Sequence, residues 1–313
     1  MRCFQLWLAN LKDLNLQVLE HEPLARHVSL KVGGKARAVI LVEELPQLVE
    51  LVNRLEVWGV SYYVLGRGTN VLVADQGYPG AVIKLTGDFS RLEAVEGGLV
   101  VGAAVPLPKL ALTAYRWGYK GLEWAAGIPG SLGGAVRGNA GAHGGSMQDV
   151  VATVEVFHPL EGVTTYDRED LDFSYRQLKL PKDGIVLSSR LSLSTGASAE
   201  TWARMEQYKA ERLRNQPLKL PNAGSVFRNP PGDYAGRLIE AVGLKGLRIG
   251  DAAVSEQHAN FIVNLGQATA ADIVRLLLLI RQRVLAETGV ALRLEWKLLG
   301  FSPDEERALE TVA

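Results

Sequence analysis

Short apolar runs and amphipathic stretches alternate along the first 75 residues of the chain. Residues 39–42 and 62–65 are predicted to be strands, and residues 43–58 between them carry leucine and valine at helical spacing. Gly59 is expected to end that helix, because glycine is common just beyond a helix C-terminus. Together with the apolar run at residues 71–73, these segments predict a compact βαββ unit.

Apolar strands recur between residues 80 and 104, where the sequence Glu-Gly-Gly at residues 96–98 is typical of a hairpin turn. Residues 107–117 begin beside a proline and are predicted to be a helix. Residues 30–195 are therefore predicted to form two small α+β lobes. Apolar runs in the second lobe predict further strands at residues 151–157, 163–166 and 185–193.

A different pattern begins after a charged helix that is predicted at residues 198–214. Thr269 and Asp272 form a capping box before an apolar helical face that stops ahead of Gly289. Residues 292–299 are predicted to be a closing strand. The C-terminal third is therefore expected to be a separate domain, followed by a polar tail.

Composition and charge limit the class of function. The 313 residues are 47% apolar, which is enough for hydrophobic cores, and 34 Lys and Arg residues balance 34 Asp and Glu residues. This balance argues against a nucleic-acid partner and favours a small-molecule substrate. Cys3 is the only cysteine and the 5 histidines are scattered, so neither an internal disulfide nor a metal site is expected. No stretch is apolar enough for a signal core or a membrane helix, so we expect a cytoplasmic protein with no membrane partner.

Glycine is concentrated in one segment, because residues 127–145 contain 8 glycines in 19 positions. Such density lets main-chain N–H groups approach a ligand, most often a phosphate or a diphosphate. Residues 66–70 (Gly-Arg-Gly-Thr-Asn) form a second glycine-rich turn between two predicted strands, and they match neither standard nucleotide-binding loop. The two segments together favour a split diphosphate site over two unrelated turns.

Three polar residues are ambiguous when each is considered alone. Ser225 follows a glycine but lies outside a Gly-x-Ser-x-Gly motif, so it is either a turn-capping serine or a proton donor. Arg176 follows two aromatic residues and is either a clamp for a carboxylate or phosphate or an ordinary surface arginine. Glu295 lies in the predicted closing strand, where its side chain could equally belong to a solvated face.

In combination, these motifs resemble the bacterial UDP-N-acetylenolpyruvoylglucosamine reductases, flavoenzymes that make UDP-N-acetylmuramate for peptidoglycan. The resemblance extends over residues 15–300. Only 48 residues separate Arg176 from Ser225, so the chain resembles the shorter type that lacks an extra substrate-capping loop. Seven ordered motifs carry the resemblance: residues 27–34, 65–72, 127–145, 174–176, 223–230 and 258–264, and Glu295.

The resemblance implies an α+β protein with a vanillyl-alcohol-oxidase-like (PCMH-type) FAD-binding fold of two lobes and a smaller α+β substrate-binding domain. It implies FAD-binding lobes at residues 1–79 and 80–197, a substrate-binding domain at 198–300 and a polar tail at 301–313. FAD is expected to bind noncovalently, because Asn70 stands where covalently flavinylated relatives carry histidine. The residues implied in FAD binding are Gly66, Arg67, Gly68, Thr69, Asn70, Val71, Gly127, Ile128, Pro129, Gly130, Ser131, Gly134, Asn139, Ala140 and Gly141.

The resemblance also implies a reaction in which NADPH reduces FAD and the flavin then delivers a hydride to an enolpyruvyl group. Arg176 and Glu295 match positions that stabilise the resulting enediolate, and Ser225 matches the proton donor to C2. The residues expected to contact the substrate, from the resemblance or from charge, are His143, Tyr175, Lys219, Arg228, Asn229, His258 and Lys297.

The chain departs from the family pattern at two positions, because some members of the family carry tyrosine at the position of His143 and arginine at that of Lys297. Whether these two residues contact the substrate therefore stays open. Two other functions also stay open. One is a sugar or aldonolactone oxidase on the same flavin fold, which would not need Ser225 with Glu295. The other is a noncatalytic nucleotide-sugar sensor. In each case we expect a monomer that binds a small molecule.

Overall fold

The computed structural model describes residue 7, residues 11–180 and residues 184–310. The chain divides into two compact units. Unit 1 consists of Met1–Glu20, Ala38–Arg67 and Gly80–Ala210, and unit 2 consists of His21–Arg37, Gly68–Pro79 and Glu211–Ala313. Two segments from the N-terminal part of the chain therefore belong with the C-terminal third. Domains defined as continuous stretches of sequence do not include such an arrangement.

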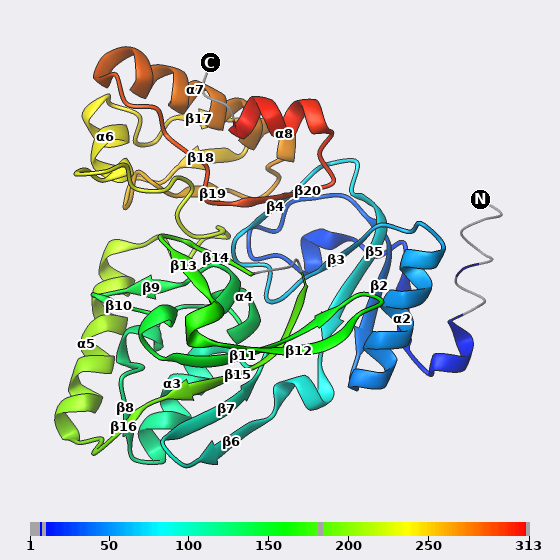
Figure 1. The fold of residues 1–313 in the computed structure, drawn as a ribbon. Coiled ribbons are helices and arrows are strands. Elements are labelled where there is room, and N and C mark those ends of the chain that lie inside the picture. The colour runs from blue at the N-terminus through cyan, green and yellow to red at the C-terminus, as the bar shows by residue number, and fades with distance from the viewer. Residues whose placement is uncertain (1–6, 8–10, 181–183, 311–313) are drawn as a thin grey trace. The chain divides into compact units, whose positions relative to one another are not determined.

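The first sheet of unit 1 has the strand order β1-β2-β5-β3, and helix α2 packs against it (Figure 1). The helix forms as expected from its periodicity, because Leu48, Leu51, Val52 and Leu55 lie on one face and are all buried against the sheet. A capping box between Glu44 and Gln47 fixes where the helix begins. The elements are β1 (Gln17–Glu20), β2 (Ala36–Val42), α2 (Leu45–Val57), β3 (Tyr62–Val64) and β5 (Tyr78–Leu85).

The prediction of a βαββ unit is wrong for its last strand. The third strand, β4 (Val71–Val73), lies outside this sheet and pairs in parallel with β20 (Lys297–Leu299) in unit 2, while β5 takes the place beside β3. All three residues of β4 are buried. A fully apolar run indicates that a strand is buried on both faces. It has no alternation of polar and apolar residues that would indicate which strand pairs with it.

The second sheet of unit 1 is antiparallel, in the order β12-β11-β15-β7-β6, and packs on helices α3 and α4 in a common hydrophobic core. The predicted hairpin turn is confirmed, because β6 and β7 pair around it and Gly97 has a φ of 74°. The elements are β6 (Leu92–Val95), β7 (Gly98–Gly102), α3 (Leu107–Arg116), α4 (Leu132–Arg137), β11 (Val151–His158), β12 (Gly162–Asp167) and β15 (Ile185–Ser192).

Short two-stranded ladders and a long helix complete unit 1. The hairpin β13–β14 carries Arg176 at its turn. Helix α5 (Ala199–Asn215) confirms the predicted charged helix, and it runs from unit 1 into unit 2. The short strands are β8 (Tyr119–Lys120), β9 (Gly141–Ala142), β10 (Gly145–Ser146), β13 (Asp172–Ser174), β14 (Gln177–Lys179) and β16 (Ser194–Thr195). The 3-10 helices of unit 1 are Lys12–Leu14, Gly87–Ser90, Glu123–Ala125, Met147–Asp149 and Arg168–Asp170, and Leu24–Arg26 is a 3-10 helix of unit 2.

Unit 2 is built on a three-stranded sheet, β17-β18-β19, with α7 packed on it. The predicted closing strand is shorter than expected, since only β20 pairs in a ladder, and Leu294 makes an isolated bridge with Phe227. Within the polar tail, helix α8 lies beside α7, and Arg281 donates hydrogen bonds to the carbonyl oxygens of Ala308 and Leu309 (Figure 1). The elements are α6 (Ala235–Ala241), β17 (Arg248–Ile249), β18 (Ala252–Val254), β19 (Ile262–Asn264), α7 (Ala270–Thr288) and α8 (Pro303–Glu310).

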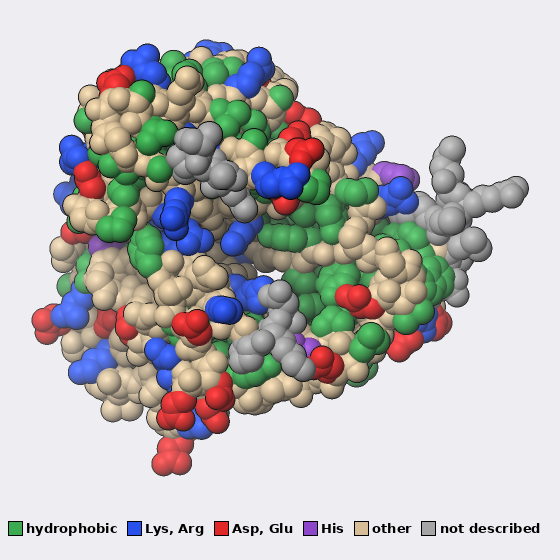
Figure 2. Space-filling model, turned by 45° about the horizontal axis from the view of Figure 1, so that its top comes forward, with side chains coloured by type: hydrophobic (Ala, Val, Ile, Leu, Met, Phe, Trp, Pro, Cys, Tyr) green, Lys and Arg blue, Asp and Glu red, His purple; other side chains and the backbone are tan. Residues whose placement is uncertain are grey.

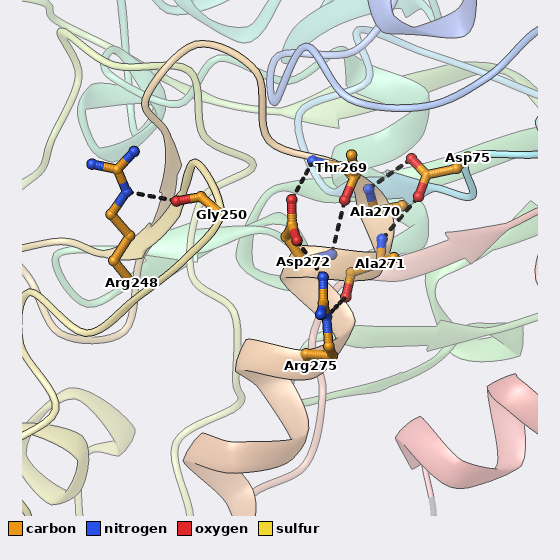
Figure 3. Close-up of polar contacts among 8 residues, drawn as sticks. All are labelled: Asp75, Arg248, Gly250, Thr269, Ala270, Ala271, Asp272 and Arg275. Atoms are coloured by element: carbon orange, nitrogen blue, oxygen red, sulfur yellow. Dashed lines mark hydrogen bonds and ion pairs between the residues drawn. The ribbon is translucent and has the colours of Figure 1, made fainter.

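Two carboxylates, those of Asp75 and Asp272, cap the N-terminus of α7 (Figure 3). Thr269 and Asp272 form the predicted capping box, and the helix ends at Gly289 in the left-handed conformation, so both predicted ends are confirmed. Asp75, which follows β4, accepts hydrogen bonds from the main-chain N–H groups of Ala270 and Ala271 at 2.8 and 2.9 Å. These bonds connect the segment that contains β4 to helix α7 within unit 2.

Acidic and basic side chains both occur on the face drawn in Figure 2, in keeping with the balanced charge of the chain. Among the described residues, no helix combines the length and the hydropathy that a membrane-spanning segment requires. In the same part of the chain, no three His, Cys, Asp or Glu residues gather as metal ligands.

Candidate functional site

The two glycine-rich loops meet in unit 1. The Nε of Arg67 donates a hydrogen bond to the carbonyl oxygen of Pro129 at 3.1 Å. A Cβ atom on Gly66 would lie 2.5 Å from the Oγ of Ser131, so any larger residue at position 66 would displace that hydroxyl. The segments that the sequence analysis combined into one site are therefore neighbours in the folded unit.

Several main-chain N–H groups around this contact are available to a ligand. In the part of the chain that the structure describes, the amides of Gly66, Arg67, Gly127, Gly130 and Ser131 donate to no carbonyl oxygen and no side chain. Such groups bind anionic oxygens well, because each supplies a fixed donor without bringing a side chain between the backbone and the ligand. The residues of this loop pair fit the diphosphate of a dinucleotide such as FAD.

Lys84 of β5 is a nearby cation that the sequence analysis missed. Burial lowers the pKa of its ammonium group, and the positive charge of Arg67 lowers it further. Two cations that raise each other's energy are stabilised by an anion between or beside them. Lys84 lies near the end of a strand and in no motif, so the sequence gave no reason to single it out.

The remainder of the first loop belongs to unit 2. Gly68 has a φ of 63°, and its carbonyl oxygen accepts a hydrogen bond from the N–H of Ser29 at 2.9 Å. Asn70 is bound to the C-terminal segment, because its Nδ2 donates to the carbonyl oxygen of Glu295 at 3.3 Å and its own carbonyl oxygen accepts from the N–H of Lys297 at 3.0 Å. The first loop is thereby joined to the segment that carries the candidate acid.

The segments that carry Ser225 and Glu295 are bridged within unit 2. The N–H of Glu295 donates to the carbonyl oxygen of Val226 at 2.8 Å, and the N–H of Arg228 donates to the carbonyl oxygen of Arg293 at 2.8 Å. This short antiparallel bridge holds Ser225 and Glu295 on adjoining segments. Both residues are half-buried, so each side chain is accessible to a small molecule.

Arg176 belongs to unit 1, where it occupies the turn between β13 and β14 with a φ of 60°. Its Nη1 donates to the carbonyl oxygen of Gly141 at 3.0 Å, and its guanidinium lies 5.2 Å from the ring centre of Tyr175. The side-chain amide of Asn139 supports this hairpin by donating to the carbonyl oxygen of Ser174 at 2.9 Å. Asn139 therefore positions the hairpin, a contribution that its place in the glycine-rich run does not indicate.

The residues expected to contact substrate divide between the units. His143 is exposed in unit 1 and stacks on Tyr208, with ring centres 4.0 Å apart. In unit 2, the Oδ1 of Asn229 accepts the N–H of Ala235 at the start of α6. The accessibility of the others is as follows: Tyr175, Lys219 and Lys297 are exposed, whereas Arg228 and His258 are half-buried.

His258 is held in its neutral form. Its Nδ1 accepts a hydrogen bond from the N–H of Asn260 at 3.1 Å, which requires an unprotonated nitrogen. Burial is the main cause that lowers its pKa, and Lys245 lowers it further, whereas a hydrogen bond with the main chain and the charge of Glu240 oppose the shift. The ring also lies edge-on to Phe261, with ring centres 4.9 Å apart.

This environment predicts an acid-sensitive contribution to stability. The folded-state pKa of His258 lies below its ordinary value of 6.5, so its contribution is complete above that pH and is lost as the pH falls through the lowered value. We expect the melting temperature of a His258→Asn variant to depend less on pH than that of the wild type between about pH 7 and pH 5. Parallel pH dependences in thermal unfolding would contradict the assignment of a neutral ring.

Family models match both halves of the chain. The model of an FAD binding domain matches residues 36–165, and that of the C-terminal domain of UDP-N-acetylenolpyruvoylglucosamine reductase matches residues 216–299. These matches contain the loop pair of unit 1 and the Ser225 and Glu295 segments of unit 2.

Individual relatives are similar over almost the whole chain. UDP-N-acetylenolpyruvoylglucosamine reductase 2 of Symbiobacterium thermophilum is 45% identical over 90% of this chain and 92% of its own length. The corresponding reductase of Heliobacterium modesticaldum is 44% identical over 93% of each chain. The crystal structure of UDP-N-acetylenolpyruvylglucosamine reductase from Thermus caldophilus aligns with a TM-score of 0.77 at 42% identity, and covers 91% of this chain and 99% of that one.

The expected α+β fold with an FAD-binding domain is therefore confirmed. Because relatives at 44% and 45% identity span nine-tenths of its length, this chain belongs to the UDP-N-acetylenolpyruvoylglucosamine reductase family.

Proposed function

We propose that this chain uses NADPH to reduce UDP-N-acetylglucosamine enolpyruvate to UDP-N-acetylmuramate, a step in the synthesis of peptidoglycan precursors. The observation that carries the proposal is the bridge in unit 2 that holds Ser225 and Glu295 on adjoining segments, with Asn70 bound to Glu295. Reduction of an enol ether needs a proton donor and a stabilising acid, and these residues supply both functions. Membership of the family supports the same substrate.

FAD is the cofactor that the loop pair of unit 1 fits. When bound, FAD carries a hydride from NADPH to the carbon–carbon double bond of the substrate. The open amides beside Gly66 and Ser131 would hold its diphosphate, with Arg67 and Lys84 as nearby cations. Binding is noncovalent, because residue 70 is an asparagine, whose amide forms no bond to a flavin and donates its Nδ2 hydrogen to the main-chain carbonyl oxygen of Glu295.

The protein supplies the proton and stabilises the charge. Addition of a hydride to the methylene carbon leaves an enediolate, which the guanidinium of Arg176 and the carboxyl group of Glu295 stabilise by hydrogen bonds. The hydroxyl of Ser225 then donates a proton to C2 and regains one from water. One NADPH and one proton are consumed for each double bond that is reduced.

The remaining assignments are proposals of the same kind. The protein acts as a cytoplasmic monomer in three functional domains, two FAD-binding lobes and a substrate-binding domain. His143, Tyr175, Lys219, Arg228, Asn229, His258 and Lys297 contact the nucleotide sugar. The exposed Lys219 and Lys297 suit the diphosphate of the substrate, since each presents a cation to solvent.

The cofactor assignment predicts a charge-specific effect at Ser131. A Ser131→Asp variant would present a carboxylate to the open amides, compete for them and repel the diphosphate, whereas Ser131→Asn adds similar bulk without charge. We expect the aspartate variant to bind FAD about 10- to 100-fold more weakly than the asparagine variant, as a charge repulsion of this kind predicts. Titration of the apoprotein with FAD measures both affinities. Equal weakening by the two variants would argue against a diphosphate at this place.

Turnover distinguishes the reductase from the alternatives. With UDP-N-acetylglucosamine enolpyruvate present, NADPH oxidation should match the formation of UDP-N-acetylmuramate one for one and should not depend on oxygen. An oxidase on the same fold would consume oxygen, and a nucleotide-sugar sensor would show no turnover. Mass spectrometry of the product, in air and without it, separates the three functions.

A further inference from the structure

Asn260 supplies hydrogen-bond partners for the main chain of the segment that contains Ser225 (residues 225–228, the Ser225 segment) on one of its sides. Its Oδ1 accepts the N–H of Phe227 at 2.9 Å, and its Nδ2 donates to the carbonyl oxygen of Phe227 at 2.8 Å. Its own carbonyl oxygen accepts the N–H of Val226 at 2.9 Å. The side chain is 3% exposed, so water cannot replace these bonds without opening the unit.

The other side of the same segment is bound to the strand that carries Glu295. The carbonyl oxygen of Val226 accepts the N–H of Glu295 at 2.8 Å, and Phe227 and Leu294 form the isolated bridge. Residues 226–228 are thus held between Asn260 and residues 293–295. Ser225 directly precedes these residues, and Gly224 before it has a φ of 74°. The N–H of Gly224 donates to the Oδ1 of Asn222 at 3.0 Å, so Ser225 is held from both sides, and Asn260 supplies bonds on the side that follows it.

Asn260 is itself held rigidly. Its N–H donates to Nδ1 of His258, and the turn closes because the N–H of Phe261 donates to the carbonyl oxygen of His258 at 3.0 Å. The N–H of Ser255 donates to the carbonyl oxygen of Phe261 at 2.8 Å. A residue whose main chain is fixed in this way can hold its side chain in a defined place against the segment that it binds.

We propose that Asn260 is a positioning residue that sets the place of the Ser225 hydroxyl for proton delivery to the substrate. This inference rests on the proposed function. Asn260 does not touch the reacting atoms; it acts through the main chain of Val226 and Phe227. Proton donation is sensitive to small displacements of the donor, whereas NADPH-dependent reduction of the cofactor does not use Ser225.

Asn264 is a matched control in the same unit. It is also 3% exposed, and its side chain also satisfies main-chain groups, namely the carbonyl oxygen of Leu30 and the N–H groups of Gly266 and Ala268. None of these groups belongs to residues 225–228. Replacing either asparagine with alanine therefore leaves buried polar groups without a partner, but only one replacement releases the Ser225 segment.

The test separates the two half-reactions of the holoenzyme in anaerobic stopped flow. We expect Asn260→Ala to lower the limiting rate of flavin re-oxidation by the enolpyruvyl substrate about 10- to 100-fold, the range for a misplaced reacting group. The rate of flavin reduction by NADPH should change less than about threefold, and so should the substrate concentration for half-saturation. Asn264→Ala should lower the melting temperature as much as Asn260→Ala and leave both half-reactions near wild type.

Asn260→Asp keeps the experiment informative if the alanine variant does not fold. Aspartate has the size of asparagine and still accepts the N–H of Phe227, but it turns an acceptor towards the carbonyl oxygen of Phe227. It should slow re-oxidation selectively as well. A Ser225→Ala/Asn260→Ala double variant should lose much less than the product of the two single losses, because both changes remove the same proton transfer.

Three results would overturn the proposal: re-oxidation by Asn260 variants at the wild-type or Asn264→Ala rate, an equal slowing of both half-reactions, or fully multiplicative losses in the double variant. Wild-type turnover of the enolpyruvyl substrate is measured in the same series. If the wild type is inactive, the proposed function fails; if it is active and one of these results is found, only the positioning role fails.

Discussion

Replacing Ser225 with alanine should leave NADPH-dependent flavin reduction intact and slow re-oxidation by the enolpyruvyl substrate about 100- to 10,000-fold, the range for a positioned general acid. The reason is that only the second half-reaction requires a proton at C2. The fold should tolerate the change, because Ser225 is half-buried and its segment is anchored by the main chains of Val226 and Arg228. Anaerobic stopped flow measures the two rate constants separately.

A serine far from this segment provides the control. Ser192 is exposed on β15 in unit 1, so Ser192→Ala should match the wild type in both half-reactions. If Ser225→Ala re-oxidises as fast as Ser192→Ala, Ser225 is not the proton donor. If flavin reduction slows as much as re-oxidation, the serine has a structural or cofactor-binding function instead.

Glu295→Gln should produce the second large effect, a loss of about 100- to 1,000-fold in re-oxidation, comparable with removal of one stabilising group from an oxyanion site. Glutamine has nearly the same shape, and both main-chain contacts of residue 295, with Val226 and Asn70, stay in place. The change therefore removes the acid with little disturbance of the local structure. Single-turnover re-oxidation at saturating substrate measures the loss.

Glu287→Gln is the matched control, because Glu287 is a partly exposed residue of α7 that pairs with Arg283. An exposed pair of this kind contributes little, so we expect wild-type rates from this variant. Wild-type re-oxidation by Glu295→Gln would show that the carboxyl group is not needed for the chemistry. The enediolate would then have to be stabilised by other groups.

The elements that the sequence predicted best are those in which periodicity and end signals agree. Helix α7 is an example, because its capping box at Thr269 and the glycine at residue 289 both mark its ends. The hairpin between β6 and β7 is another, because its turn needs glycine. The family, the fold and the cofactor were identified from ordered motifs, and the comparisons confirm them.

The pairing of short buried strands could not be predicted. Val71–Val73 is apolar throughout, and nothing in three such residues indicates that β20 is its partner more than 200 positions later. Glycine and asparagine positions were also difficult to interpret. Asn139 and Asn260 each satisfy the main chain of a distant loop, and single polar residues in loops carry no periodicity that could indicate such contacts.

The contribution of charge was predicted only in part. The sequence indicated main-chain anion binding at residues 66–70 and 127–145, and the structure brings Gly66 and Ser131 of these loops together. It did not indicate Lys84, which lies in a strand far from any motif and is recognised by its burial near Arg67. Charged groups that act together are found from their three-dimensional arrangement more readily than from spacing along the chain.

The most direct test of the central claim is re-oxidation of the reduced wild-type holoenzyme without oxygen. The protein is first reduced with one equivalent of NADPH and then mixed with UDP-N-acetylglucosamine enolpyruvate, while the absorbance of the flavin is followed. The proposed function predicts full recovery of the oxidised flavin spectrum and one UDP-N-acetylmuramate for each flavin. A flavin that stays reduced until oxygen is admitted would contradict it.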